Sequence, residues 1–130
     1  MEQNEKTRAL LAAFGCALAY LLAGKALTAV LPQVPEEAAR MWAFVHRCAA
    51  APIVEELVFR GIIQQLARPL GERQAVALQA VLFAVQHRGP AGMAYALVCG
   101  LVLGTIRSRT GSVWPGMLLH TLNNLLVFAA

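Results

Sequence analysis

The sequence predicts an all-α fold, a polytopic membrane helix bundle of about five helices. Hydrophobic residues make up 58% of the 130 residues and charged residues only 14%, which is too apolar for an ordinary soluble domain of this length. The apolar runs are separated by short breaks that contain Pro, Gly and Arg. The eleven Lys and Arg residues are scattered between these runs without a basic stripe, so we expect them to set membrane topology and not to bind nucleic acid.

The first helix is expected over residues 9–31, an apolar run that follows Lys6 and Arg8. A cleaved signal peptide is the competing interpretation. The run is longer than a typical signal-peptide core and no small-residue cleavage site follows it, so we expect the helix to be retained. It forms, with the connection after it, an N-terminal anchor over residues 1–35, and a helix bundle follows over residues 36–130.

A polar connection that contains two prolines, residues 31–37, leads to a second helix over residues 38–67. Trp42 is placed as an anchor at the membrane interface. Pro52 lies inside this helix, where it removes one backbone donor and crowds the carbonyl four residues earlier. We therefore expect a kink about one turn before Glu55.

The third and fourth helices are expected over residues 74–87 and 91–106, on either side of a Gly-Pro break. At 1.5 Å per residue they rise roughly 21–24 Å, against a hydrocarbon core of about 30 Å. This length predicts a tight hairpin sunk partly into the membrane. Gly100 and Gly104, four residues apart, predict a face for close helix packing.

A fifth helix is expected over residues 112–128, with Trp114 as an interfacial anchor near its start. The basic residues favour a cytoplasmic N terminus, because five spans then leave most of them on the inner side: Lys6, Arg8, Arg68, Arg73, Arg107 and Arg109. We expect a multi-pass protein of a prokaryotic inner membrane.

Glu55, Glu56 and Arg60 lie in the middle of an apolar stretch. A charged side chain at the centre of a spanning helix costs about 2.5–3.5 kcal/mol on insertion scales, so such residues point first to a functional site. Counted from the cytoplasmic end of each helix, Glu55, His87 and His120 lie at similar depths of roughly 16–21 Å. Residues of three separate helices are therefore expected in one layer near the middle of the membrane.

Helical spacing divides these residues into two pairs and a free carboxylate. Glu56 and Arg60 are four residues apart on one face, in the order that favours an ion pair. Glu55 points about 100° away and is free to hydrogen-bond a water molecule. His120 and Asn124 are also four residues apart, and their imidazole and carboxamide are donors suited to an oxyanion.

The ordered set Glu55-Glu56-x-x-x-Arg60, Phe83-x-x-x-His87 and His120-x-x-x-Asn124 resembles the motifs of the CPBP family, the CAAX proteases and bacteriocin-processing enzymes also called Abi. The resemblance covers residues 50–126 and implies an intramembrane glutamic endopeptidase whose catalytic core lies on helices 2, 3 and 5. It implies that Glu55 and His87 activate a water molecule and that His120 and Asn124 stabilise the oxyanion. Glu56 and Arg60 would support the catalytic helix, and Phe83 would pack one turn below His87.

Several alternatives stay open. Glu55, His87 and His120 could form a zinc site with two histidines and one carboxylate, although we expect a mechanism without a metal or other cofactor. The chain could also be a membrane protein that binds a peptide or confers immunity without catalysis. Nothing chooses between a prenylated protein, a bacteriocin and a C-terminal sorting tail as the membrane-associated substrate, and the oligomeric state is open.

Overall fold

The computed structural model describes residues 2–31 and 34–130, and within them every regular element is helical. The predicted connection is described only in part, because Pro32 and Gln33 lie outside the described residues. The all-α prediction is confirmed, and five helices form the fold. The first is α1 (Glu2–Val30), and the last three are α5 (Glu72–Ala84), α6 (Gly89–Thr110) and α7 (Trp114–Ala129).

The second helix is a continuous rod from Glu36 to Leu66 that changes its turn type along its length. The α-helical stretches α2 (Glu36–Val45), α3 (Ala51–Glu55) and α4 (Gln64–Leu66) alternate with the wider π-helical stretches η1 (His46–Ala50) and η2 (Glu56–Ile63). A short 3₁₀ turn, η3 (Arg68–Leu70), follows. π-helical turns inside helices are often found at functional sites, and η2 begins at Glu56, directly after Glu55.

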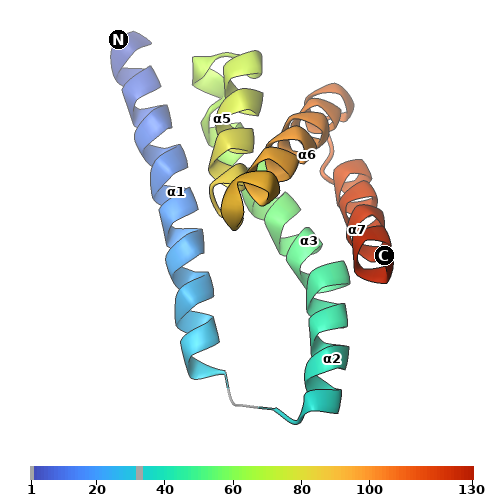
Figure 1. Cartoon of the computed structure of the whole chain (residues 1–130). Coiled ribbons are helices and arrows are strands. Elements are labelled where there is room, and N and C mark those ends of the chain that lie inside the picture. The colour runs from blue at the N-terminus through green and yellow to red at the C-terminus, as the bar shows by residue number, and fades with distance from the viewer. Residues whose placement is uncertain (1, 32–33) are drawn as a thin grey trace.

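The rod bends between α2 and α3, near Pro52, where the sequence predicts a kink (Figure 1). The Ala51 N–H donates to the His46 carbonyl five residues earlier. Pro52 has no N–H to continue this pattern, so the next carbonyl, that of Arg47, lacks its main-chain donor. The Asn124 side chain takes this place, with its Nδ2 atom 2.8 Å from the Arg47 oxygen.

The length predicted for the fourth helix is wrong. The helix α6 has 22 residues, a rise of about 33 Å, which is enough to cross a membrane. Pro90 does not delay its start, because proline is tolerated in the first helical turn. The helix continues to Thr110 and ends where Gly111 adopts a φ of +69°, a left-handed conformation that commonly terminates helices. Both α1 and α6 are long and apolar enough to span a membrane.

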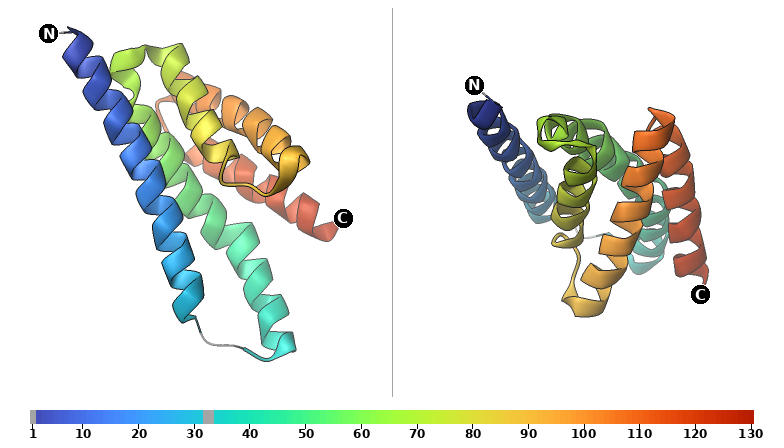
Figure 2. Two further views of the ribbon diagram at one scale, coloured as in Figure 1. Left: turned by 60° about the vertical axis from the view of Figure 1, so that its left-hand side comes forward. Right: turned by 90° about the horizontal axis from the view of Figure 1, so that it is seen from above.

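The core joins α1, the rod, α5 and α6, and α1 lies at the edge of the bundle against the rod and α5 (Figure 2). Ala13 and Ala17 on α1 are buried, and these small side chains allow the helices to approach closely. Beside them, Tyr20, Phe59 and Phe83 form a chain of edge-to-face contacts with ring centroids 5.4 and 5.1 Å apart. The aromatic chain runs from α1 to the residues predicted to form the site.

The helices α5 and α6 pack closely because Gly100 has no side chain. A Cβ atom at Gly100 would lie 2.9 Å from both Cα and Cβ of Ala80, which is too close for the two helices to keep their positions. We expect Gly100→Ala to lower the free energy of unfolding by about 1–3 kcal/mol, as overpacking does. Thermal or detergent-induced unfolding would measure it.

Gly15→Ala is the matched control, since a Cβ atom at this helical glycine meets nothing within 4 Å. It should leave stability unchanged or raise it by up to about 1 kcal/mol, the difference in helix propensity. Equal effects of the two substitutions would contradict the close packing at Gly100.

Candidate active site

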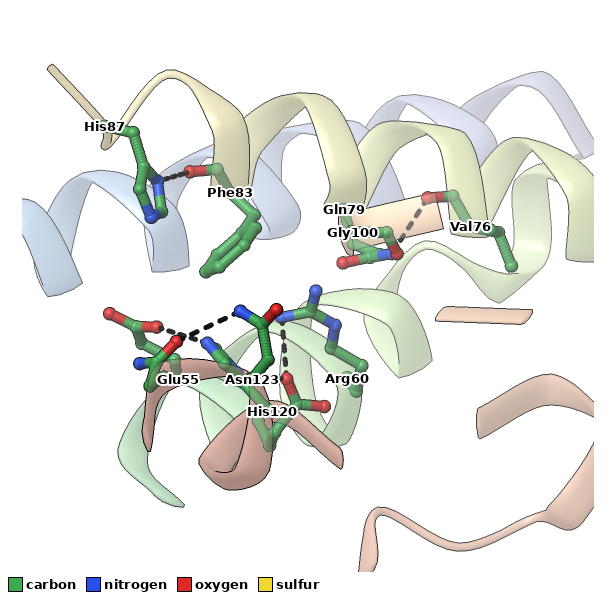
Figure 3. A network of polar contacts seen from close by, with 11 residues as sticks. Glu55, Arg60, Val76, Gln79, Phe83, His87, Gly100, His120 and Asn123 are labelled. Atoms are coloured by element: carbon green, nitrogen blue, oxygen red, sulfur yellow. Dashed lines mark hydrogen bonds and ion pairs between the residues drawn. The ribbon is translucent and has the colours of Figure 1, made fainter. Parts of the chain in front are cut away.

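Four of the predicted site residues line one cavity of about 420 Å³: Glu55, His87, His120 and Asn124. They come from three segments of the chain. Glu55 ends α3, His87 lies in the turn between α5 and α6, and the other two lie on α7. Figure 3 shows His87 on one side of the site, facing Glu55 and His120 on the other.

The Glu55 carboxylate faces the His120 ring. Its Oε2 atom lies 3.6 Å from His120 Nε2. The Glu55 side chain is 19% exposed and that of His120 is 7% exposed, so the carboxylate stays open to the cavity while the imidazole is nearly enclosed. This arrangement leaves Glu55 able to contact a water molecule.

The Glu56 carboxylate is completely buried and lies between the Arg60 guanidinium and the His120 ring. Its Oε1 atom lies 3.1 Å from Arg60 Nη1, so the ion pair expected from the four-residue spacing is present. The same oxygen lies 2.9 Å from His120 Nδ1, a contact that the sequence does not predict. Because a carboxylate accepts, His120 Nδ1 carries the hydrogen, and the ring is held with Nε2 towards Glu55.

Phe83 lies at the centre of the site. The Arg60 guanidinium stacks on its ring at 4.4 Å from the centroid, a favourable cation–π contact. The edges of His87 and His120 also pack against Phe83, with centroids 4.8 and 5.8 Å away. Phe83 is therefore the packing partner of both imidazoles and not of His87 alone.

His87 lies three residues beyond the end of α5, and not in the helix as predicted. The chain leaves the helix through a tight turn in which the His87 N–H donates to the Ala84 carbonyl. The His87 Nδ1 atom lies 3.1 Å from the Phe83 carbonyl oxygen, which can only accept, so this nitrogen carries the hydrogen. In the neutral ring, Nε2 then has a lone pair available to take a proton.

Asn124 uses one of its two Nδ2 hydrogens on the Arg47 carbonyl, as described above, and keeps the second. The neighbouring Asn123 accepts a hydrogen bond from Tyr95 through Oδ1 and lines a different, mainly apolar cavity of about 220 Å³. Of these two asparagines, Asn124 is the one that lines the cavity with Glu55.

His46 and Arg47 also line the cavity, although no motif marks them. Arg47, Ala51 and Glu55 are spaced four residues apart, so they share one face of the rod. This spacing is the sequence signal that would have found Arg47. Arg47 adds a positive charge to the lining of this cavity.

The described part of the chain contains no group of three or more His, Cys, Asp or Glu side chains placed to hold a metal ion together. Among the proposed zinc ligands, Glu55 Oε2 and His120 Nε2 lie 3.6 Å apart. The donor set is present in the cavity, but its members do not converge on one point.

The comparisons with known proteins agree with the motifs. A family model described as type II CAAX prenyl endopeptidase Rce1-like matches residues 37–126, which is more than half of the chain. The matched range includes all the predicted site residues that line the cavity: Glu55, His87, His120 and Asn124. No curated protein and no solved structure matched. The chain belongs to the Rce1-like type II CAAX prenyl endopeptidases, a family of membrane-embedded proteases.

Proposed function

We propose that the protein is an intramembrane endopeptidase of the glutamic type, which hydrolyses a peptide bond in a membrane-associated protein or peptide. One observation carries this proposal. A carboxylate, two imidazoles and a carboxamide from three separate segments line a single cavity of about 420 Å³. General base catalysis and oxyanion stabilisation require these kinds of group around one reacting bond.

In the proposed reaction, a water molecule lies between Glu55 and His87 and attacks the scissile carbonyl carbon. Glu55 takes a proton from the water, with His87 Nε2 as a second acceptor. In this proposal the His120 ring carries a hydrogen on both nitrogens. Its Nδ1–H stays on Glu56, and its Nε2–H and the free Nδ2 hydrogen of Asn124 donate to the oxyanion of the tetrahedral intermediate. The protonated Glu55 then gives its proton to the leaving nitrogen, so that the enzyme returns to its starting state.

Glu56, Arg60 and Phe83 support this arrangement without touching the substrate. Glu56 holds His120 through Nδ1, Arg60 balances the charge of Glu56, and Phe83 packs against both imidazoles. Oxyanion donors act through preorganisation, so fixing the His120 ring is the expected contribution of this layer.

We also propose a cytoplasmic N terminus in a prokaryotic inner membrane. The start of α1, the turn before α5 and the end of α6 lie at the same end of the bundle, and they carry most of the basic residues (Figure 1). Positive loops stay on the cytoplasmic side. A single cysteine introduced in place of Arg109 should be protected from an impermeant maleimide in intact cells. Labelling at this position would show that the N terminus lies outside and would contradict the proposed orientation.

The experiment that tests the function is cleavage of membrane peptides in H₂¹⁸O, followed by mass spectrometry. Hydrolysis should create new termini with ¹⁸O in the new carboxyl group, and Glu55→Gln should create none. Absence of cleavage by the wild-type protein over a broad peptide set would favour a non-catalytic peptide-binding protein. Activity that a chelator removes and zinc restores would replace the metal-free mechanism by zinc catalysis.

A further inference from the structure

The Arg60 guanidinium is fully buried, yet the contacts described so far use little of its hydrogen-bonding capacity. A guanidinium has five N–H donors. Within residues 2–31 and 34–130, the Nε atom and both Nη atoms have no aligned hydrogen-bond acceptor, although Nη1 makes the ion pair with Glu56. An unpaired buried donor costs about 1–3 kcal/mol, so acceptors for these donors are expected nearby.

Gln64 carries one buried acceptor that has no donor in the described structure and lies in the neighbourhood of Arg60. It lies one turn after Arg60 on the rod, is 3% exposed and lines the same small void as Arg60. Its Nε2 atom donates to the Gly104 carbonyl and to Ser108 Oγ, both at 3.0 Å. Both amide hydrogens are therefore used on α6, and the Oε1 atom, which has no donor among the described residues, is the free end of the side chain.

Gln79, on α5 one turn before Phe83, carries a second buried acceptor that has no donor within the described ranges. It is fully buried, and its Nε2 atom donates to the Gly100 carbonyl at 2.8 Å and to the Val76 carbonyl at 3.0 Å. Figure 3 shows its side chain extending towards the Arg60 guanidinium. Its Oε1 atom, like that of Gln64, is buried and has no donor in the described part of the chain.

We propose that Gln64 and Gln79 are positioning residues, whose carboxamide oxygens accept N–H groups of Arg60 and hold its guanidinium against Glu56. Each glutamine is oriented by a carbonyl of α6, that of Gly104 or Gly100. In this arrangement α6 orients the glutamines, the glutamines hold Arg60, Arg60 holds Glu56, and Glu56 holds the His120 ring. The effect on catalysis rests on the proposed function, whereas the contact with Arg60 does not.

The glycine pair of α6 has a second role in this arrangement. A Cβ atom at Gly104 would lie 2.3 Å from Gln79 Nε2 and 3.2 Å from Val76 Cγ1. The absence of a side chain therefore makes room for the Gln79 carboxamide as well as for the approach of α5. Gly100 and Gly104 lie about one helical turn apart, so their carbonyls accept from Gln79 and Gln64 at successive turns of α6.

Kinetics on the full-length protein in detergent or liposomes tests the catalytic consequence. Gln64→Leu and Gln79→Leu keep most of the side-chain volume but remove the acceptor together with the Nε2 donors that orient it, and each should lower kcat at least tenfold. The KM should stay unchanged, because neither glutamine lines the cavity with Glu55. Gln65→Leu is the matched control: the same change at an exposed neighbour should leave kcat unchanged.

The contact itself is tested by NMR on protein labelled with ¹⁵N-arginine, with the Arg60 Nε–H signal assigned by its loss in Arg60→Lys. Its exchange with water should be slow in the wild type and at least tenfold faster in Gln79→Leu. Gln79→Glu retains an acceptor oxygen and should keep the slow exchange, which separates loss of the acceptor from general loosening. Equal exchange rates in Gln79→Leu and the wild type would overturn the proposal.

The two proposals fail in different ways. If Glu55→Gln leaves the chain as active as the wild type while Gln79→Leu still accelerates Arg60 exchange, the mechanism is wrong and the glutamine contacts stand. If Glu55→Gln abolishes cleavage while both leucine variants keep wild-type kcat and exchange, the glutamine contacts are wrong and the mechanism stands.

Discussion

Glu55→Gln should lower kcat by about 10²–10⁴-fold, the usual contribution of a general base. The amide has nearly the same shape as the carboxylate but cannot take a proton from water. Because Glu55 contacts the water and not the rest of the substrate in the proposed mechanism, KM should change little. Initial rates of cleavage of one membrane peptide, over a range of concentrations, would give both constants.

The control for this substitution is Glu37→Gln, the same change at an exposed glutamate in the first turn of α2. It should leave kcat at the wild-type value. A Glu55→Gln protein that retains its fold and more than half of the wild-type kcat would remove Glu55 from the mechanism. His87→Ala would then identify whether the imidazole alone acts as the base.

Arg60→Met should lower the free energy of unfolding by about 3–5 kcal/mol, the usual cost of breaking a buried ion pair by removing one partner. The Glu56 carboxylate is 0% exposed, so without Arg60 its charge would be buried beside His120 alone. The cation–π contact with Phe83 would be lost as well. Detergent-induced unfolding, followed by circular dichroism, would measure the change.

Two further variants show whether the burial of the charge causes this effect. Arg68→Met breaks the pair with Glu72, whose side chains are 47% and 46% exposed, and should cost no more than about 1 kcal/mol. The double variant Glu56→Gln/Arg60→Met removes both charges and should regain most of the lost stability without regaining activity. Equal losses in Arg60→Met and Arg68→Met would contradict the buried pair.

The number of helices and the local pairs were predictable because both depend on short-range spacing. Glu56 with Arg60 is one such pair, and the sequence also places Glu55, His87 and His120 in one layer. Helix ends were less predictable. The helix α6 extends through Arg107 to Thr110 because polar residues at a membrane interface continue a helix without continuing its apolar run. His87 left its helix because backbone turns, and not hydrophobicity, determine where α5 ends.

The contact between Glu56 and His120 lies beyond such reasoning because it depends on how closely two helices pack. The helix α7 approaches the rod at Gly116, where a Cβ atom would lie 2.9 Å from Glu56 Oε2. A single glycine four residues before His120 is therefore the sequence feature behind this contact. Because the sequence does not give the position of the rod, Gly116 alone does not predict that His120 contacts Glu56.

The vacant carbonyl of Arg47 makes two distant positions of the chain depend on each other. Pro52 creates the vacancy, and Asn124, which lies 77 residues after Arg47 in the sequence, fills it. A variant with an ordinary residue at position 52 would offer an N–H to compete for that oxygen, and the asparagine would be free to turn. Anyone transplanting this site into another scaffold should therefore move the proline and the asparagine as one unit.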